Sequence, residues 1–286
     1  MSHGDHHQHS THQDSAHHHG ALGDDESALA ELLDLDAEAL PDHLPQVTAL
    51  IQLHADGPIR RIADMGSGTG TGTLALTQRF PDAEVTALDM SATMLEHLSA
   101  KAEARGVAER VHTRRTDLDE GWPDLHNLDL VWASNSLHHT ADPQRVLRDI
   151  HDALRPGGLF ALAELTDMPR FLSGELGEVE DRMHTALGDE TAAHVPHLGS
   201  DWATLITKAG FEIRAEHRFT IAVDPPLSDA AVRLAVATLS RMREGLADRL
   251  APADRTALDA LLATDPTALA NLAIRDERLV WIARRP

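Results

Sequence analysis

The chain has 286 residues, of which 42% are hydrophobic and 25% charged, a composition typical of a folded globular protein and not of a disordered or fibrous one. It contains no cysteine, which excludes disulfides, thiolate zinc sites and a cysteine nucleophile. The 46 acidic and 25 basic side chains give a formal charge of −21, which repels nucleic-acid phosphates and anionic lipids. We therefore expect neither a nucleic-acid partner nor a membrane-surface role.

Residues 1–25 are rich in histidine, with Ser, Asp, Gln and Gly between the histidines. Such a segment has little apolar surface to bury, so we predict a disordered tail. Histidine-rich tracts can chelate divalent metals, but the irregular spacing defines no coordination polyhedron. We predict no metal in the functional site and leave metal binding by the tail open. No apolar run reaches the roughly 20 residues of a membrane span, and no signal peptide is apparent, so we expect a cytoplasmic protein.

Apolar residues recur every three or four positions between Glu26 and His54, which predicts amphipathic helices. Pro41 and Pro45 divide this stretch into two helices. We assign residues 26–56 to an N-terminal helical cap.

From residue 61 onward, apolar strand-like runs alternate with helical patterns. The expected strands are 61–65, 84–89, 110–117, 128–135 and 159–165, and the expected helices are 73–80, 92–105 and 144–154. This alternation predicts βαβ units, a parallel sheet and right-handed crossovers. Ligands of such sheets bind at the carboxyl ends of the strands.

The regular alternation stops after the fifth strand. Residues 166–200 form a polar stretch with four glycines, for which we expect helices and a mobile lid. We then expect a helix at 201–209 and a strand at 211–223, and this strand completes a core domain of residues 57–223. A helical insertion at 224–276 and a final strand at 277–286 follow. Such an insertion covers a pocket, makes a homodimer contact or packs the flank of the domain. The sequence leaves these three alternatives open.

The segment from Ile62 to Gly72 reads as a short apolar strand, a glycine-rich turn and the start of a helix. Glycines let a backbone approach a ligand closely, and a helix N-terminus offers free N–H groups to an anion. The spacing departs from the dinucleotide pattern, which needs glycine at the sixth position, because Thr71 stands there when counting from Gly66. The Gly-Lys-Ser/Thr ending of a P-loop is also absent.

Asp89 lies 23 positions after Gly66, at the end of the next expected strand. A carboxylate there can accept hydrogen bonds from two vicinal ribose hydroxyls. The alternative is that Asp89 caps the following helix, because Asp is also a favourable N-cap residue.

Five segments resemble, in order, the motifs of class I S-adenosylmethionine-dependent methyltransferases. They are Asp64–Gly70, Val85–Met90, Thr116–Leu118, Leu128–His139 and Leu154–Gly158. The resemblance extends from about Asp56 to Phe219 and is closest to the small-molecule branch of the ubiquinone-biosynthesis type. It implies an α/β fold, namely a seven-stranded Rossmann-like sheet that is mostly parallel with its last strand antiparallel. Helices would cover both faces, with the N-terminal cap and the helical insertion added.

The resemblance also implies S-adenosyl-L-methionine as the cofactor and assigns roles to matching residues. Gly66, Ser67 and Gly68 would contact the methionine part, and Gly70 belongs to the same loop. Asp89 would bind the ribose, Met90 would pack on the adenine, Asp117 would accept from the adenine amino group beside Leu118, and Asn135 would line the floor. On physical grounds, Asp64, Asp89 and Asp117 at adjacent strand ends give the electronegative surroundings that a sulfonium cation favours.

Candidate catalytic residues follow the fourth and fifth strands. His138 and His139 are suited to accepting a proton from an acceptor group near neutral pH, or they only shape the loop through hydrogen bonds. Glu164 faces the same edge and either takes part in the chemistry or accepts from loop backbone. We expect His184, His194 and His197 to be solvated side chains of the lid.

The sequence thus predicts a cytoplasmic methyltransferase that acts on oxygen, nitrogen or carbon of a small molecule, in secondary metabolism. Two alternatives stay open. One is a non-catalytic protein of this fold that binds S-adenosylmethionine or S-adenosylhomocysteine. The other, which the glycine spacing disfavours, is a nicotinamide-dependent oxidoreductase.

Overall fold

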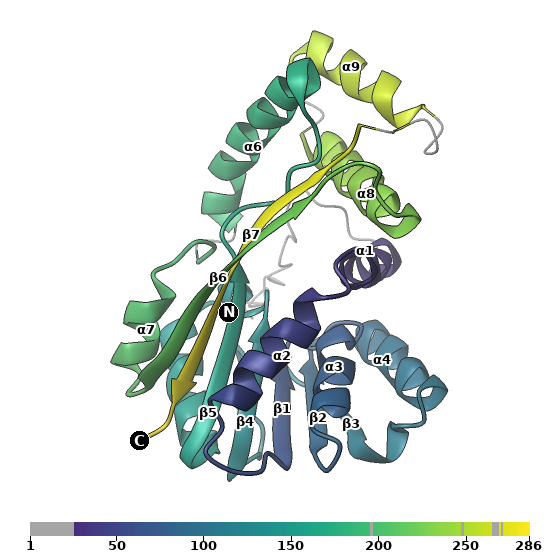
Figure 1. Ribbon diagram of the computed structural model, residues 1–286. Coiled ribbons are helices and arrows are strands. Elements are labelled where there is room, and N and C mark those ends of the chain that lie inside the picture. Colours follow the sequence, from purple (N-terminus) through teal and green to yellow (C-terminus); the bar gives the residue numbers. More distant parts are fainter. Residues whose placement is uncertain (1–25, 195–196, 247–248, 265–268, 270) are drawn as a thin grey trace, which may run out of the picture.

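The computed structural model describes residues 26–194, 197–246, 249–264, 269 and 271–286; the histidine-rich tail lies outside them. The strands are β1 (Arg61–Met65), β2 (Glu84–Asp89), β3 (Val111–Arg115), β4 (Leu128–Ser134), β5 (Leu154–Leu165), β6 (Glu212–Val223) and β7 (Ile274–Arg284). In this part of the chain they form one seven-stranded sheet in the order β3-β2-β1-β4-β5-β7-β6 (Figure 1). β1 to β5 are parallel, while β7 runs antiparallel to β5 and to β6. This confirms the predicted fold class.

Helices cover both faces of the sheet. On one face lie α2 (His43–Leu53), α3 (Thr71–Arg79) and α4 (Ala92–Ala104), and on the other lie α5 (Pro143–Ala153) and α7 (Trp202–Lys208). The predicted cap of residues 26–56 is divided in the structure, because Val47 and Ile51 of α2 are fully buried in the core over the sheet. Pro45 does not break the helix, since it lies in the first turn of α2, where its missing N–H has no helical partner.

The remaining helices gather beyond the carboxyl ends of the parallel strands. They are α1 (Glu26–Ala39), α6 (Gly174–His194), α8 (Asp229–Gly245) and α9 (Pro252–Leu262). Figure 1 shows that β6 and β7 extend past the rest of the sheet to carry them. α1 packs on α8 through Leu35, Leu234 and Leu239, whereas α6 joins α8 and α9 through Met183, Met242 and Leu258. We call these four helices the cap.

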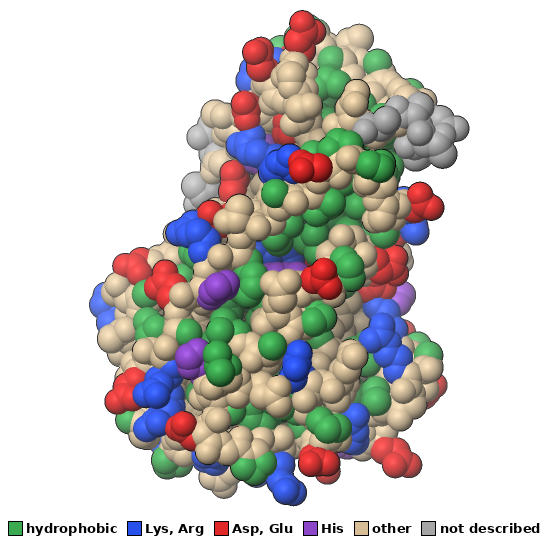
Figure 2. All heavy atoms as spheres, viewed as in Figure 1, with side chains coloured by type: hydrophobic (Ala, Val, Ile, Leu, Met, Phe, Trp, Pro, Cys, Tyr) green, Lys and Arg blue, Asp and Glu red, His purple; other side chains and the backbone are tan. Residues whose placement is uncertain are grey.

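In its described part, residues 166–194 and 197–200, the segment predicted as a lid contains one long helix. The chain first runs along β7, where Arg170 pairs with Arg275, and then forms the 21-residue helix α6. Figure 2 shows hydrophobic side chains gathered in the upper part of this face, around α8, with charged groups scattered over the surface. No helix in the described ranges has the length and apolar character to cross a membrane.

Candidate active site

The turn between β1 and α3 is closely packed against its neighbours. Gly66 and Gly70 have φ values of +66° and +84°, which disfavour any residue with a Cβ. A Cβ on Gly66 would lie 2.4 Å from Cβ of Ser136, and one on Gly70 would lie 2.1 Å from Cδ1 of Leu98. The glycines therefore bring the turn against the end of β4 and against α4, and they open its backbone to a ligand.

Asp89, at the end of β2, holds this turn. Its Oδ2 accepts from the backbone N–H of Gly68 at 2.8 Å, and its Oδ1 accepts from the N–H of Ser91 at 2.9 Å. Ser91, not Asp89, is the N-cap of α4, because its hydroxyl accepts from the N–H of Met94. The capping alternative for Asp89 is thereby excluded, and its carboxylate keeps lone pairs for further donors.

Two buried oxygens, at the turn and at the end of β4, have no hydrogen-bond partner among the described residues. They are Oγ of Ser67 and Oδ1 of Asn135. Asn135 also has a φ of +50°, which is uncommon for a residue other than glycine. Unpaired buried polar groups are costly, and they suit a site that a polar ligand completes.

Asp64, at the end of β1, is 2% exposed. The Thr73 hydroxyl donates to its Oδ2 at 2.5 Å. Burial raises the pKa of Asp64 to about 7, against the opposing effect of the Thr73 hydrogen bond, and the charge of Asp89 raises it further. The carboxyl of Asp64 therefore titrates near neutral pH.

The residues predicted to hold the adenine lie at the rim of the same edge. Met90 is 55% exposed. Asp117 is exposed and its Oδ1 accepts from the N–H of Asp119, while Leu118 packs partly against the core and its carbonyl accepts from Arg145. The structure thus places every predicted cofactor residue at the ends of β1 to β4, and of the residues predicted to hold the adenine, Met90 and Asp117 are exposed.

The three candidate catalytic residues lie together at the ends of β4 and β5. Nδ1 of His138 lies 2.5 Å from Oε2 of Glu164, and both side chains are buried. Oε1 of Glu164 also accepts from the N–H of Leu137 at 3.1 Å. The ring of the exposed His139 lies 4.1 Å from that of His138, centroid to centroid. Glu164 therefore anchors both the loop backbone and the His138 imidazole.

The predictions did not include the buried Arg278, which lies in the middle of β7 beside the end of β5. The Arg278 side chain is 7% exposed; its Nε donates to Asp276 at 2.8 Å, and its two terminal nitrogens donate to the Asp36 carboxylate of α1. Burial and the charge of Arg278 lower the pKa of the nearby His43 to about 4. One feature of the sequence could have predicted this buried arginine: it begins the run from 278 to 283, which is otherwise apolar.

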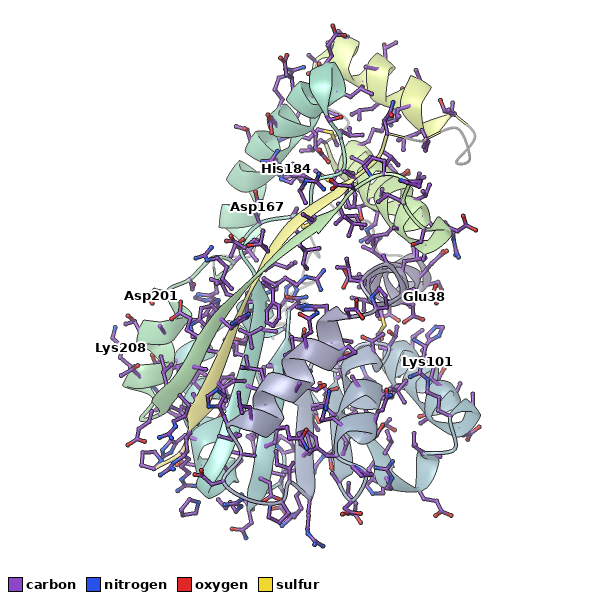
Figure 3. The ribbon with its side chains drawn as sticks, viewed as in Figure 1. Glu38, Lys101, Asp167, His184, Asp201 and Lys208 are labelled. Carbon is purple, nitrogen blue, oxygen red and sulfur yellow. The ribbon has the colours of Figure 1, made fainter. Side chains whose placement is uncertain are left out.

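His184 corrects the expectation of solvated lid histidines. Its side chain is 5% exposed and neither ring nitrogen makes a hydrogen bond within the described ranges, although Nδ1 lies 3.5 Å from Oδ1 of Asp167 (Figure 3). The imidazole nevertheless lowers the pKa of Asp167. His197 is half-buried, and the His194 side chain is outside the described residues. Within the described ranges, no three His, Asp or Glu side chains are arranged to hold a metal ion.

Comparisons with known proteins agree with this geometry. Residues 63–160 match the family model of a methyltransferase domain. A solved structure from Bacillus halodurans superposes with a TM-score of 0.56 and 18% identity, covering 86% of this chain and 99% of the other, a likeness of fold alone. Residues 63–160 therefore form a methyltransferase domain, and the resemblance seen in the sequence is confirmed.

Curated relatives match over part of their length. The 27-O-demethylrifamycin SV methyltransferase of Amycolatopsis mediterranei is 33% identical over 153 residues, covering 53% of this chain and 52% of that protein. A malonyl-[acyl-carrier protein] O-methyltransferase of Dechloromonas aromatica is 31% identical, covering 62% and 57%. A trans-aconitate 2-methyltransferase of Deinococcus radiodurans is 33% identical, covering 50% and 52%. The chain spans from about a quarter to little more than half the length of the relatives that it matches.

Proposed function

We propose that this methyltransferase domain makes the chain an S-adenosylmethionine-dependent enzyme that methylates oxygen, nitrogen or carbon of a small molecule. The observation that carries the proposal is the close-packed glycine turn, held by Asp89 and lined by the unpaired oxygens of Ser67 and Asn135. The match of residues 63–160 to a methyltransferase domain supports the choice of cofactor.

The residues present fit that cofactor. Bound S-adenosylmethionine supplies a methyl group activated by its sulfonium. Asp89 would accept from the ribose hydroxyls, while the unpaired oxygens of Ser67 and Asn135 would accept from donors of the methionine part. The Asp64 carboxyl is poised to lose its proton next to a positive charge. Met90 would cover one face of the adenine and Asp117 would accept from its amino group.

For acceptors that lose a proton, we assign the proton acceptor to Nε2 of His138. Nδ1 is engaged by the Glu164 carboxylate, so the hydrogen lies on Nδ1 and the lone pair lies on Nε2. Glu164 then orients the ring and stabilises the imidazolium that forms. His139, whose ring contacts His138, is the second candidate for this role.

The acceptor should be uncharged or cationic. All 25 Lys and Arg residues lie in described parts of the chain, and among them Arg278 has the single buried side chain. Two carboxylates already neutralise it. An acceptor carboxylate would therefore find no uncompensated positive charge in the interior. The proposed acceptor class therefore differs from the acids that the names of the malonyl and trans-aconitate relatives give for those proteins.

We place the reaction in cytoplasmic secondary metabolism, in line with the rifamycin relative.

Isothermal titration with S-adenosylhomocysteine, S-adenosylmethionine, NAD and NADP tests the cofactor. We expect micromolar binding of the two adenosyl ligands and at least a tenfold loss in Asp89→Ala. Asp82→Ala, at the opposite end of the β2 segment, is the matched control and should bind like the wild type. A nicotinamide signal, or no adenosyl binding by the wild type, would refute the proposal.

Methyl transfer is then measured with labelled cofactor on acceptors matched in scaffold that carry an amine, a hydroxyl or a carboxylate. Labelled product from the amine or hydroxyl series supports an enzyme with an uncharged or cationic acceptor. Product from the carboxylate series alone would contradict the proposed acceptor class but not the cofactor. Binding with no transfer to any acceptor would favour the non-catalytic alternative.

A further inference from the structure

Helix α1 is joined to the glycine turn by a three-residue bridge. The Thr69 hydroxyl donates to Oδ1 of Asp34 in α1 at 2.6 Å. Nζ of Lys101 in α4 donates to the same Asp34 oxygen and, at 3.2 Å, to the backbone carbonyl of Thr69. Figure 3 shows Lys101 on the side of α4 that faces α1. Three elements that are distant in the sequence therefore meet at one carboxylate.

The bridge lies directly at the turn that would bind the cofactor. Thr69 is 1% exposed, between Gly68, whose N–H donates to Asp89, and Gly70. The Leu33 side chain, next to Asp34, lies 3.0 Å from where a Cβ of Gly68 would be. The side chains of Lys101 and Asp34 are 27% and 31% exposed, so salt reaches their ion pair. α1 thus forms one wall of the turn.

The opposite side of α1 is held independently. Successive helical residues turn by about 100°, so Asp34 and Asp36 point to nearly opposite sides. On the opposite side, Asp36 pairs with the buried Arg278 of β7. Glu31, about one turn before Asp34, separately pairs with Arg233 of α8. Loss of the bridge should therefore loosen the contact between α1 and the turn while the helix remains attached to β7 and α8.

We propose that Asp34, Lys101 and Thr69 are positioning residues that hold the glycine turn, through α1, in the conformation that binds the adenosyl cofactor. The inference rests on the proposed function. A turn that is already ordered loses less conformational entropy when the ligand binds, so the bridge raises affinity without touching the ligand. Without the bridge, part of the population has α1 lifted from the turn, and the apparent affinity falls by that fraction.

The test measures S-adenosylhomocysteine affinity by isothermal titration in Lys101→Met, Asp34→Ala and Thr69→Val. We expect each to bind about three- to tenfold more weakly than the wild type, the size of effect of a partly exposed charged hydrogen bond. Added salt should weaken binding more in the wild type than in Lys101→Met. Thr69→Val removes one hydroxyl with little change of shape, so it keeps the test valid if a charge variant folds poorly.

Two controls match the charge changes. Glu38→Ala removes a carboxylate one turn after Asp34 in α1, from a side chain that has no hydrogen bond or ion pair with the described parts of the chain. Lys208→Met removes the only other lysine, which lies in α7 (Figure 3). Both should bind within about twofold of the wild type. An equal loss in the controls would mean a general charge effect and would overturn the proposal.

Hydrogen exchange of residues 26–40 supplies a readout that does not depend on activity. Without ligand, these amides should exchange faster in Lys101→Met than in the wild type, and the ligand should slow them more. Unchanged affinity in all three bridge variants, or weaker binding with unchanged exchange in α1, would overturn the inference. A wild type that ignores the ligand would instead overturn the proposed function.

Discussion

Two regions of the molecule are built from different kinds of contact. In the cofactor region, at the ends of β1 and β2, the joined residues are near in sequence: Asp64 and Thr73 are nine residues apart, and Gly68 and Asp89 are 21 apart. In the other region, around Arg278 where the end of β5 meets β7, Thr166 bonds Glu277 across 111 residues and Arg278 bonds Asp36 across 242. One βαβ unit therefore builds most of the glycine turn, to which the end of β4 adds Ser136 and α1 adds Asp34, whereas the contacts around Arg278 join residues from both ends of the chain.

The same substitution in the two regions should have opposite effects. Gly66→Ala places a Cβ against Ser136 at positive φ, so we expect at least a hundredfold loss of S-adenosylhomocysteine affinity and a lower melting temperature. Gly188→Ala in α6 meets open space and should stabilise the protein by about 0.5–1 kcal/mol. Titration and thermal unfolding check both. If Gly66→Ala bound S-adenosylhomocysteine as the wild type does, the close packing of the glycine turn would not be needed for binding, and the contrast between the two regions would be wrong.

Glu164→Gln should affect transfer and leave cofactor binding intact. The amide no longer stabilises a positively charged His138, so we expect the methyl-transfer rate to fall about 10- to 100-fold, with S-adenosylhomocysteine affinity within twofold. Glu180→Gln is the control, since Glu180 is another buried carboxylate that accepts from two backbone N–H groups, in the cap. An equal loss of rate in the control would assign the effect to folding.

Asp64 should make stability and binding depend on pH. Its pKa is about 7 in the fold against 3.8 for an ordinary Asp, so ionisation opposes folding: stability is greatest at low pH and falls as pH rises toward 7. The ionisation of Asp64 lowers the free energy of unfolding by at most about 4 kcal/mol, because a pKa change of one unit corresponds to about 1.4 kcal/mol. Asp64→Asn should flatten the fall in melting temperature between pH 5 and 8, whereas Asp82→Asn should not.

Binding should show the opposite sign. A cationic ligand favours ionised Asp64, so affinity for S-adenosylmethionine, which carries a positive sulfonium, should rise as pH increases through about 7 and then level off. Asp64→Asn should lose this dependence. An unchanged slope in the variant would mean that a different group controls the titration.

The smallest effect is expected in the cap. Arg243 of α8 donates twice to Asp259 of α9, at 2.8 and 3.0 Å, but the Asp259 side chain is 50% exposed. Arg243→Met should change the melting temperature by less than about 2 °C and leave ligand binding unchanged. A larger shift in unfolding would show that exposed ion pairs, in addition to the apolar contacts of Met183 and Met242, hold the cap together.

Sequence reasoning was most accurate where local pattern decides the structure. β1 and β2 have the predicted bounds, because each is a short run of mostly buried residues ended by a glycine turn or a helix cap. β5 begins earlier than predicted, since Leu154 pairs with Leu128 across an irregularity in register. β7 also begins earlier, at Ile274, because buried Asp276 and Arg278 occupy inward positions where an apolar pattern was expected.

The sequence by itself determined the parallel α/β core, the glycine turn and the placement of Asp89 and Glu164 at strand ends, because periodicity and turn chemistry are local properties. The tertiary structure decided which groups lie together beyond one unit. α2 covers the sheet, α1 meets Thr69 and Lys101, and Arg278 has two carboxylate partners. These contacts join residues tens to hundreds of positions apart, and their pairing is set by how the cap helices pack over the sheet, which no local pattern encodes.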